Sequence, residues 1–238
     1  MQKVIHRSES RGLTAVGWLV SRHTFSFGNY YDPERQNFGL LRVLNQDLVL
    51  PGEGFDTHHH DNMEIVSIPY QGSLHHKDSA GHEMIIKTGD VQIMSAGTGV
   101  DHSEFNHSGQ EPIEFLQIWV YPKKMNIAPR YEQKSFDLVA HKNNFLTVVS
   151  PKEDGKSLWI NQDAWFLLGV FEKNKIVKYR LEKNDHGIYL FVLEGTLRIA
   201  DEELRRGDGI GISQIEAVDI HMVEDAKLLL IEVPMHES

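Results

Sequence analysis

Short strand-like segments separated by turn signals constrain the fold of this chain more than any other feature. The segments Glu64 to Tyr70 and Phe115 to Val120 are rich in β-branched, aromatic and other apolar residues. Turn-forming residues follow at intervals of roughly ten residues, the spacing typical of sandwiches and barrels. No stretch of the first half shows a convincing helical period. We therefore expect an all-β sandwich or barrel.

Alternating or continuous apolar residues predict further strands in the first half. We expect one at the end of residues 18–27, a short pair at 40–45 and 47–50 around Asn45-Gln46, hairpin arms at 74–78 and 82–86, and a strand at 91–94. Residues 95–99 are small and predict a loop. Residues 121–140 contain Pro122, Pro129 and several charges, which indicates a connector.

The second half repeats the order of the first. The segment from Tyr189 to Leu197 is similar to that from Glu64 to Leu74, and the segment from Arg206 to Ile212 is similar to residues 88–93. Both halves thus contain a strand, a glycine, a hairpin, a Gly-Asp turn and another strand. A duplicated β-barrel module explains this order. We expect barrels at residues 1–130 and 131–238.

Two pairs of polar residues with the same spacing predict a metal site. In an extended segment, alternate side chains point to opposite faces, so His58 and His60 share a face and His59 points away. By the same rule His102 and Glu104 share a face. Three imidazoles and a carboxylate can hold a divalent metal ion and leave room for water or substrate. The second half has neither pair at the equivalent places, so we expect one metal site.

We do not expect the other histidines of the first half, or Glu64, to bind the metal. Glu64 shares its parity with His58 and His60, and we expect it to accept a hydrogen bond from a metal-binding imidazole rather than to bind metal. Surface or loop positions are expected for His75, His76, His82 and His107. The residues His23, Phe25 and Phe27 fall on one face, where they either line the barrel mouth or pack in the core.

Composition excludes several classes of function. The 24 basic and 34 acidic residues give a net charge of −10, and no basic stripe is visible, so we do not expect direct nucleic-acid binding. Cysteine is absent, which removes disulfides and thiolate ligands. We see neither a secretory signal nor a run of about 18 apolar residues, so we expect a cytoplasmic protein that does not cross a membrane. The sequence leaves the oligomeric state open, and our expectation is a monomer.

Motifs in order along the chain resemble a known family. Gly52, His58-x-His60 and Gly72 resemble the first cupin motif, and Gly89, Gly97, His102 and Asn106 resemble the second. More narrowly, the chain resembles the pirin family, which is bicupin. The matching segments are residues 23–33 (HTFSFGNYYDP), 57–64, 93–99 (IMSAGTG), 102–104 (HSE), 117–119 (QIW) and 129–133 (PRYEQ).

This resemblance implies a fold and a cofactor. The fold would be two tandem cupin β-barrels of the jelly-roll type, also called double-stranded β-helices. One divalent metal ion, usually iron in this family, would be held by His58, His60, His102 and Glu104. Nickel, copper, manganese, cobalt or zinc would also suit nitrogen and oxygen ligands. Relatives often have proline where this chain has His59.

The resemblance also implies a function. Some bacterial members are quercetin 2,3-dioxygenases, so we expect a metal-dependent dioxygenase that cleaves quercetin-like flavonols with O2. Glu104 would act as the general base on a metal-bound substrate hydroxyl. An animal member is a metal-dependent transcriptional cofactor, so a non-enzymatic iron or redox sensor that binds a protein partner is the alternative. A purely structural metal is a third hypothesis.

Overall fold

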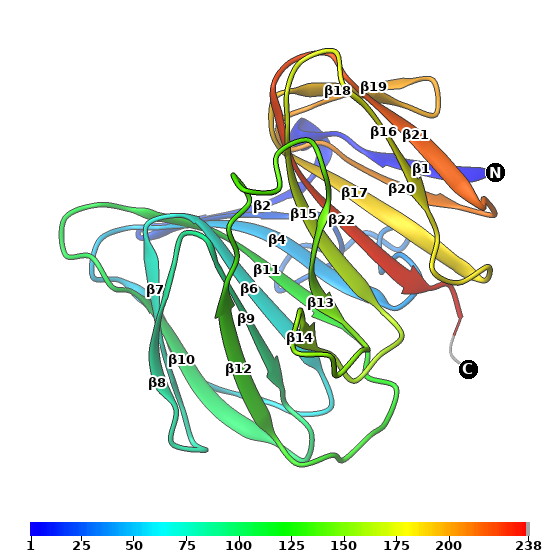
Figure 1. Cartoon of the computed structure of the whole chain (residues 1–238). Helices are drawn as coiled ribbons and strands as arrows, with labels where there is room; N and C mark the ends of the chain where they lie inside the picture. The colour runs from blue at the N-terminus through cyan, green and yellow to red at the C-terminus, as the bar shows by residue number, and fades with distance from the viewer. Residues whose placement is uncertain (237–238) are drawn as a thin grey trace.

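The computed structural model describes residues 1–236 and confirms the all-β prediction. It contains 22 strands and one short 3-10 helix, η1 (Ser8–Ser10). The strands form two seven-stranded and two four-stranded sheets. Each large sheet faces one small sheet, so that the molecule consists of two β-sandwiches (Figure 1).

The first sandwich contains all the strands that carry the predicted metal ligands. Its seven-stranded sheet has the order β12 (Arg130–Ser135), β9 (Asp90–Ser95), β6 (Glu64–Gln71), β11 (Ile113–Val120), β4 (Leu41–Val49), β3 (Leu19–His23) and β2 (Gly12–Val16). Its four-stranded sheet has the order β5 (Gly54–His60), β10 (Val100–Asn106), β7 (Ser73–Asp78) and β8 (Glu83–Lys87).

The second sandwich has the same arrangement. Its large sheet has the order β1 (Gln2–His6), β20 (Gly209–Ser213), β17 (His186–Glu194), β22 (Ala226–Pro234), β15 (Trp165–Phe171), β13 (Leu146–Ser150) and β14 (Leu158–Trp159). Its small sheet has the order β16 (Ile176–Arg180), β21 (Ala217–Met222), β18 (Thr196–Ile199) and β19 (Glu202–Arg205). The matching turn glycines, Gly72 and Gly195, have φ angles of 81° and 84°, which favour glycine. The predicted repeat is therefore present.

The two sandwiches take their outermost strands from unexpected parts of the chain. β12 lies inside the predicted connector, yet it pairs with β9 at the edge of the first sandwich. β1 begins the chain and occupies the equivalent edge of the second sandwich, where it pairs with β20 (Figure 1). The connector prediction is thus wrong for residues 130–135. The division into 1–130 and 131–238 stays a prediction.

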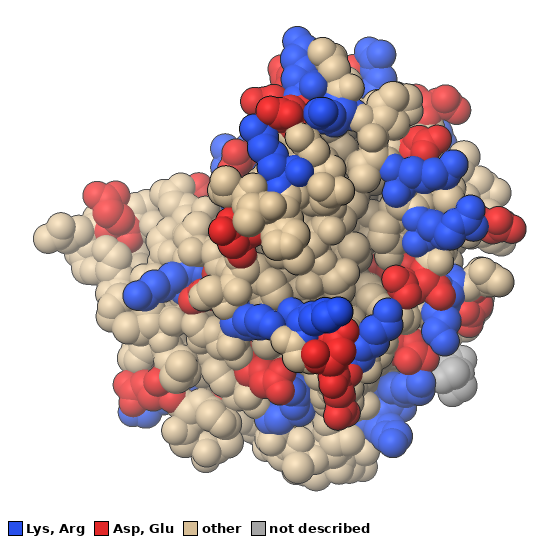
Figure 2. Space-filling view, in the orientation of Figure 1, with Lys and Arg blue, Asp and Glu red and all other residues tan. Residues whose placement is uncertain are grey.

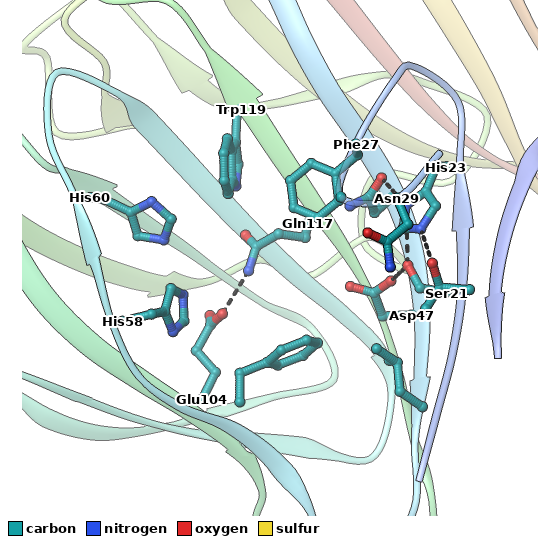
Figure 3. A pocket seen from close by; sticks show the side chains of 15 residues that line it. Ser21, His23, Phe27, Asn29, Asp47, His58, His60, Glu104, Gln117 and Trp119 are labelled. Carbon is teal, nitrogen blue, oxygen red and sulfur yellow. Dashed lines mark hydrogen bonds between the residues drawn. The ribbon is translucent and has the colours of Figure 1, made fainter. Parts of the chain in front are cut away.

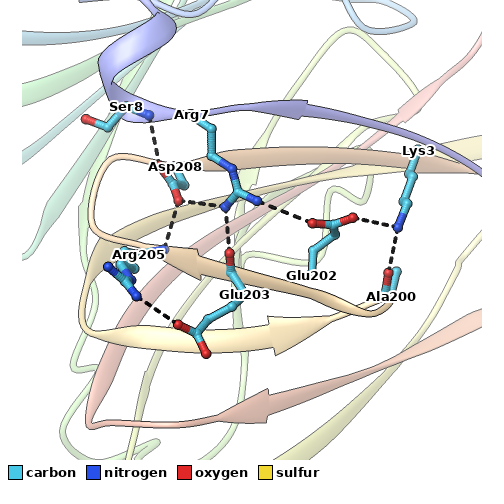
Figure 4. Close-up of polar contacts among 8 residues, drawn as sticks. All are labelled: Lys3, Arg7, Ser8, Ala200, Glu202, Glu203, Arg205 and Asp208. Atoms are coloured by element: carbon cyan, nitrogen blue, oxygen red, sulfur yellow. Dashed lines mark hydrogen bonds and ion pairs between the residues drawn. The ribbon is translucent and has the colours of Figure 1, made fainter.

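A polar network fixes β1 and the following turn to the second sandwich (Figure 4). The Asp208 carboxylate accepts hydrogen bonds from the backbone N–H of Ser8 (2.8 Å) and from the Arg7 guanidinium (3.1 Å). Glu202 pairs with Arg7 and with Lys3 at 3.3 and 2.8 Å. These contacts join the N-terminal segment to residues about 200 positions later in the sequence. No local sequence pattern predicts such a pairing.

The β4 region differs from the predicted strand pair. Leu41–Val49 is one continuous strand, so Asn45 and Gln46 do not form a turn. Their side chains find partners inside the protein instead: the Asn45 amide oxygen accepts a hydrogen bond from His23, and the Gln46 amide donates one to Tyr70. Polar residues that find partners across neighbouring strands do not need the water that a turn would give them.

The largest apolar cluster joins side chains of both seven-stranded sheets, which therefore pack face to face. Its members include Leu41, Val66, Ile93, Leu116 and Ile118 from the first sandwich and Val149, Phe166, Phe191, Leu229 and Ile231 from the second. This shared core gives each sandwich one buried outer face. The interior of each sandwich is then left to the opposite faces of the same strands.

The interiors of the two sandwiches differ in polarity. One row across the first large sheet pairs polar residues on neighbouring strands, in the order Asn45, Gln117, Ser67 and Gln92. The equivalent row of the second sheet is apolar, in the order Leu167, Leu230, Leu190 and Ile210. The second interior is thus a packed core, and the first provides hydrogen-bonding groups for a site.

The surface mixes charges of both signs on the face in view. Figure 2 shows lysine and arginine side chains interspersed with aspartate and glutamate over this face. Several of these side chains form ion pairs, among them Lys123 with Asp163 at 2.8 Å and Lys142 with Glu172 at 2.9 Å. Interspersed charges do not produce the single-sign field that steers nucleic acid to a surface.

Candidate metal centre

Strands β5 and β10 bring the three predicted histidine ligands together. In the antiparallel ladder His102 lies directly opposite His58, and His60 follows two residues along β5. The ligand nitrogens of His58, His60 and His102 all lie within 4.8 Å of one another. The ring centroids of His58 and His102 are 4.5 Å apart. The period-two argument therefore identified three imidazoles that converge on one point.

The protonation of these imidazoles suits a cation. Burial lowers the pKa of His60 to about 4 and that of His102 to about 3, so both are neutral at neutral pH. Within residues 1–236 neither ring nitrogen of His102 has a hydrogen-bond partner, although the side chain is buried. His58 donates its Nδ1–H to the Asp56 carbonyl at 2.7 Å, which leaves Nε2 free. Neutral, converging imidazoles are the donors that a divalent metal needs.

Glu104 reaches this centre from a deeper position. A β-bulge shifts the register after His102, so that Glu104 lies opposite Phe55 on β5. Its buried carboxylate accepts hydrogen bonds from the Gln117 amide (2.7 Å) and the Ser67 hydroxyl (3.2 Å). One oxygen lies within 4.8 Å of a ligand nitrogen of His102. The structure thus places Glu104 beside the histidines, while its role as a ligand stays a prediction.

His76 corrects the expectation of a surface residue. Its side chain is fully buried, and a ring nitrogen lies within 4.8 Å of ligand atoms of His102 and Glu104. His76 is paired with Glu104 across β7 and β10, and its Nε2 lies 3.1 Å from Asp78. Leu74, His76 and Asp78 are at every second position of β7, so all three point to its inner face. The apolar Leu74 could have indicated that His76 faces inward. His75 and His82 are only partly buried, as expected for hairpin arms.

Of the two residues near the predicted ligands that we did not expect to bind metal, the prediction is right for His59 and wrong for Glu64. His59 points outward, 58 % exposed, with Nδ1 2.8 Å from Asp101, in agreement with the alternation argument. Within residues 1–236 Glu64 forms no hydrogen bond with an imidazole, and it accepts hydrogen bonds from Ser95 (2.8 Å) and the backbone N–H of Asn161 (3.1 Å). The prediction for Glu64 is therefore wrong. Asn62 has a φ of 45° between the two strands, and this turn resets the alternation.

A cavity of about 210 Å³ opens beside the histidines (Figure 3). His58, His60, Glu104 and Gln117 lie on one side of it, and its apolar lining includes Phe27, Phe55 and Trp119. Trp119 makes edge-to-face contacts with His60 and Phe27, at centroid distances of 4.9 and 5.2 Å. Flat apolar walls next to converging ligands suit a planar aromatic molecule.

His23, Phe25 and Phe27 were expected either to line the barrel mouth or to pack in the core, and the structure divides them between these two environments. His23 and Phe27 line the cavity, whereas Phe25 is 1 % exposed and packs in the core shared by the two sandwiches. β3 ends at His23, so the alternation does not continue to Phe25. Both of the expected environments therefore occur within this one segment.

Comparison with known proteins agrees with this geometry. The sequence matches the family described as Pirin over residues 5–120 and that described as Quercetinase C-terminal cupin domain over residues 147–233. It is 38 % identical over 234 residues to a quercetin 2,3-dioxygenase of Escherichia coli K12, covering 97 % of this chain and 98 % of the relative. The chain belongs to the pirin family. Its two sandwiches are the two cupin domains of a bicupin.

Solved structures extend the comparison. This pirin superposes on the bacterial pirin YhhW of Escherichia coli, solved in complex with nickel(II), with a TM-score of 0.92 and 35 % identity, covering 98 % of this chain and 99 % of YhhW. The fold is also shared by a quercetin 2,3-dioxygenase of Acinetobacter baumannii, which is 24 % identical and has a TM-score of 0.80 over 97 % of this chain and 85 % of that one.

Within residues 1–236 we find no helix with the length and apolar character needed to span a membrane.

A polar wall of the cavity was missed by sequence reasoning. Ser21 and Asp47 are cross-strand partners on β3 and β4, and the Ser21 hydroxyl donates to Asp47 Oδ1. Burial raises the pKa of Asp47 to about 7. The signal was present as two polar residues at alternate positions, Asn45 and Asp47, which share the inward face of the strand. The predicted turn at Asn45-Gln46 concealed it.

The raised pKa of Asp47 predicts a pH-dependent stability. Because the folded-state pKa lies above the ordinary 3.8, the folded protein holds this proton more tightly than the unfolded chain does. The contribution of Asp47 to stability is therefore present at low pH and lost as the pH rises through about 7. We expect Asp47→Asn to gain stability over the native protein at pH 8, and to gain less at pH 5. Thermal melts at both pH values measure this, and an equal difference at the two would contradict it.

Proposed function

We propose that this pirin is a metal-dependent dioxygenase that cleaves quercetin-like flavonols with O2, with iron(II) as its metal. The observation that carries the proposal is the convergence of three imidazoles beside a cavity with aromatic walls. His58, His60, His102 and Glu104 would hold the ion. The names of the similar proteins, quercetin 2,3-dioxygenases, support the reaction type.

The residues of the cavity have separate tasks in this reaction. When bound, the metal supplies Lewis acidity that lowers the pKa of the flavonol hydroxyl. Glu104 would accept the proton of that hydroxyl as general base once it loosens from the ion. Gln117 and Ser67 hold the carboxylate through hydrogen bonds to its two oxygens. The deprotonated flavonol is electron-rich and reacts with O2, and Phe27 and Trp119 provide apolar surface for its rings.

The first test combines metal analysis with oxygen uptake. We expect one metal ion per chain in protein purified without added metal, and O2 uptake with quercetin by the iron-loaded protein. His58→Ala should lose metal, and with it uptake above background. His59→Ala is the matched control, because that side chain is the neighbouring histidine and points to the outside.

The outcomes separate the three hypotheses of metal function. Stoichiometric metal without uptake on any flavonol would refute the dioxygenase and favour a sensor that binds a protein partner. Unfolding on metal removal, again without uptake, would favour a structural metal. Uptake that persists in His58→Ala would remove this site from the reaction.

A further inference from the structure

The cavity wall opposite the metal centre is built from two cross-strand pairs. Ser21 lies opposite Asp47, and His23 lies opposite Asn45, all on the inner face of β3 and β4. Figure 3 shows Ser21, His23 and Asp47 across the cavity from His58 and His60. All four wall residues are buried, and the cavity is their common opening. The proposed ion and its proton acceptor use none of them.

The hydrogen bonds of this wall determine what it offers to the cavity. Thr14 donates its hydroxyl to His23 Nε2 at 2.9 Å, so His23 Nδ1 carries the proton and donates to Asn45 Oδ1 at 2.9 Å. The amide NH2 of Asn45 is then left as a donor. Ser21 occupies Asp47 Oδ1, and Oδ2 has no partner within residues 1–236. The wall therefore presents one donor and one acceptor.

A structural carboxylate in this protein looks different. Glu232, buried inside the second sandwich, accepts hydrogen bonds from the Tyr179 hydroxyl (2.7 Å) and from the backbone N–H groups of Glu182 and Lys183. Asp47 has one partner, and its free oxygen belongs to a residue that lines an open cavity. A buried acceptor with spare capacity carries a cost in free energy unless a ligand completes it.

We propose that Asp47 and Asn45 form a subsite for a phenolic hydroxyl at the end of the substrate remote from the metal. A hydroxyl both donates and accepts, so it can donate to Asp47 Oδ2 and accept from the Asn45 amide. A flavonol without that hydroxyl leaves both groups buried and unpaired, and binds more weakly. The subsite thus selects polyhydroxylated flavonols. The choice of substrate class rests on the proposed function.

The test compares two flavonols that share the metal-binding edge. Quercetin and 3-hydroxyflavone both carry the 3-hydroxyl and 4-carbonyl, and 3-hydroxyflavone has no other hydroxyl. Their dissociation constants are measured on the metal-loaded full chain without oxygen. We expect the native protein to prefer quercetin. At pH 8 Asp47 is mostly ionised, because its pKa is about 7. At that pH the preference should fall by at least about tenfold in Asp47→Leu, the effect of losing a hydrogen bond to a charged group.

Two further variants keep the test decisive. Asp47→Asn gives its amide oxygen to Ser21 and turns its NH2 to the cavity, so it should reduce the preference even if Asp47→Leu does not fold. Asp163→Asn is the control, because this carboxylate pairs with Lys123 outside the cavity. An unchanged preference in a folded Asp47 variant would overturn the subsite, and so would a native protein without preference.

The subsite and the proposed function fail in distinguishable ways. A reduced preference in the Asp47 variants without O2 uptake by the native protein would keep the subsite and refute the dioxygenase. Uptake by the native protein with an unchanged preference would do the reverse. If neither flavonol binds the metal-loaded protein, both proposals are wrong.

Discussion

Flavonol turnover falls by about 10²- to 10⁴-fold in Glu104→Gln, the contribution of a general base, while the metal is retained. The three imidazoles converge without Glu104, so they can hold the ion in the variant. The Gln side chain keeps the shape of Glu and can still accept a hydrogen bond from Gln117. It cannot accept the proton of the substrate hydroxyl. Metal analysis and O2 uptake on the same sample measure both quantities.

Glu64→Gln is the matched control for this experiment. Glu64 is also a buried carboxylate, but it bonds to Ser95 and to the backbone of Asn161 rather than facing the cavity. We expect its turnover to stay close to that of the native protein. Native-like turnover in Glu104→Gln would show that another group takes the proton. Loss of metal from that variant would instead assign Glu104 a role mainly in holding the ion.

The largest loss of stability is expected for Phe25→Ala, at about 3–5 kcal/mol of unfolding free energy. Phe25 is 1 % exposed and contacts the rings of His6 and Tyr189 at centroid distances of 5.6 and 5.7 Å. Those two residues belong to the second sandwich, so this ring packs between the two cupin domains. Its removal leaves a cavity that a rigid sheet cannot fill. Urea unfolding measures the change.

Phe27→Ala separates packing from substrate binding. Phe27 is two residues further along, lines the cavity and contacts Trp119. We expect a smaller loss of stability than in Phe25→Ala and a clear loss of flavonol affinity. Equal losses of stability in the two variants would contradict the assignment of Phe25 to the core and Phe27 to the cavity.

Local patterns in the sequence were sufficient wherever neighbouring residues decide the structure. Alternation along β5 placed His58 and His60 on one face and His59 on the other, because a regular strand has a period of two. The repeated glycine turns revealed the two cupin domains, since Gly72 and Gly195 require the same positive φ. Each of these features depends on a few consecutive residues, so it can be read before the chain is folded.

The tertiary structure alone decided which distant segments meet. No strand is predicted at β1, and β12 falls in the predicted connector. Pairing with β20 and β9 makes both segments strands. His76 is buried because β10 lies beside β7, and Asp47 faces a cavity because β3 covers one edge of β4. The turn at Asn62 took Glu64 away from the imidazoles. Strand pairing joins residues far apart in sequence, so burial and hydrogen-bond partners at these positions are properties of the assembled sheets.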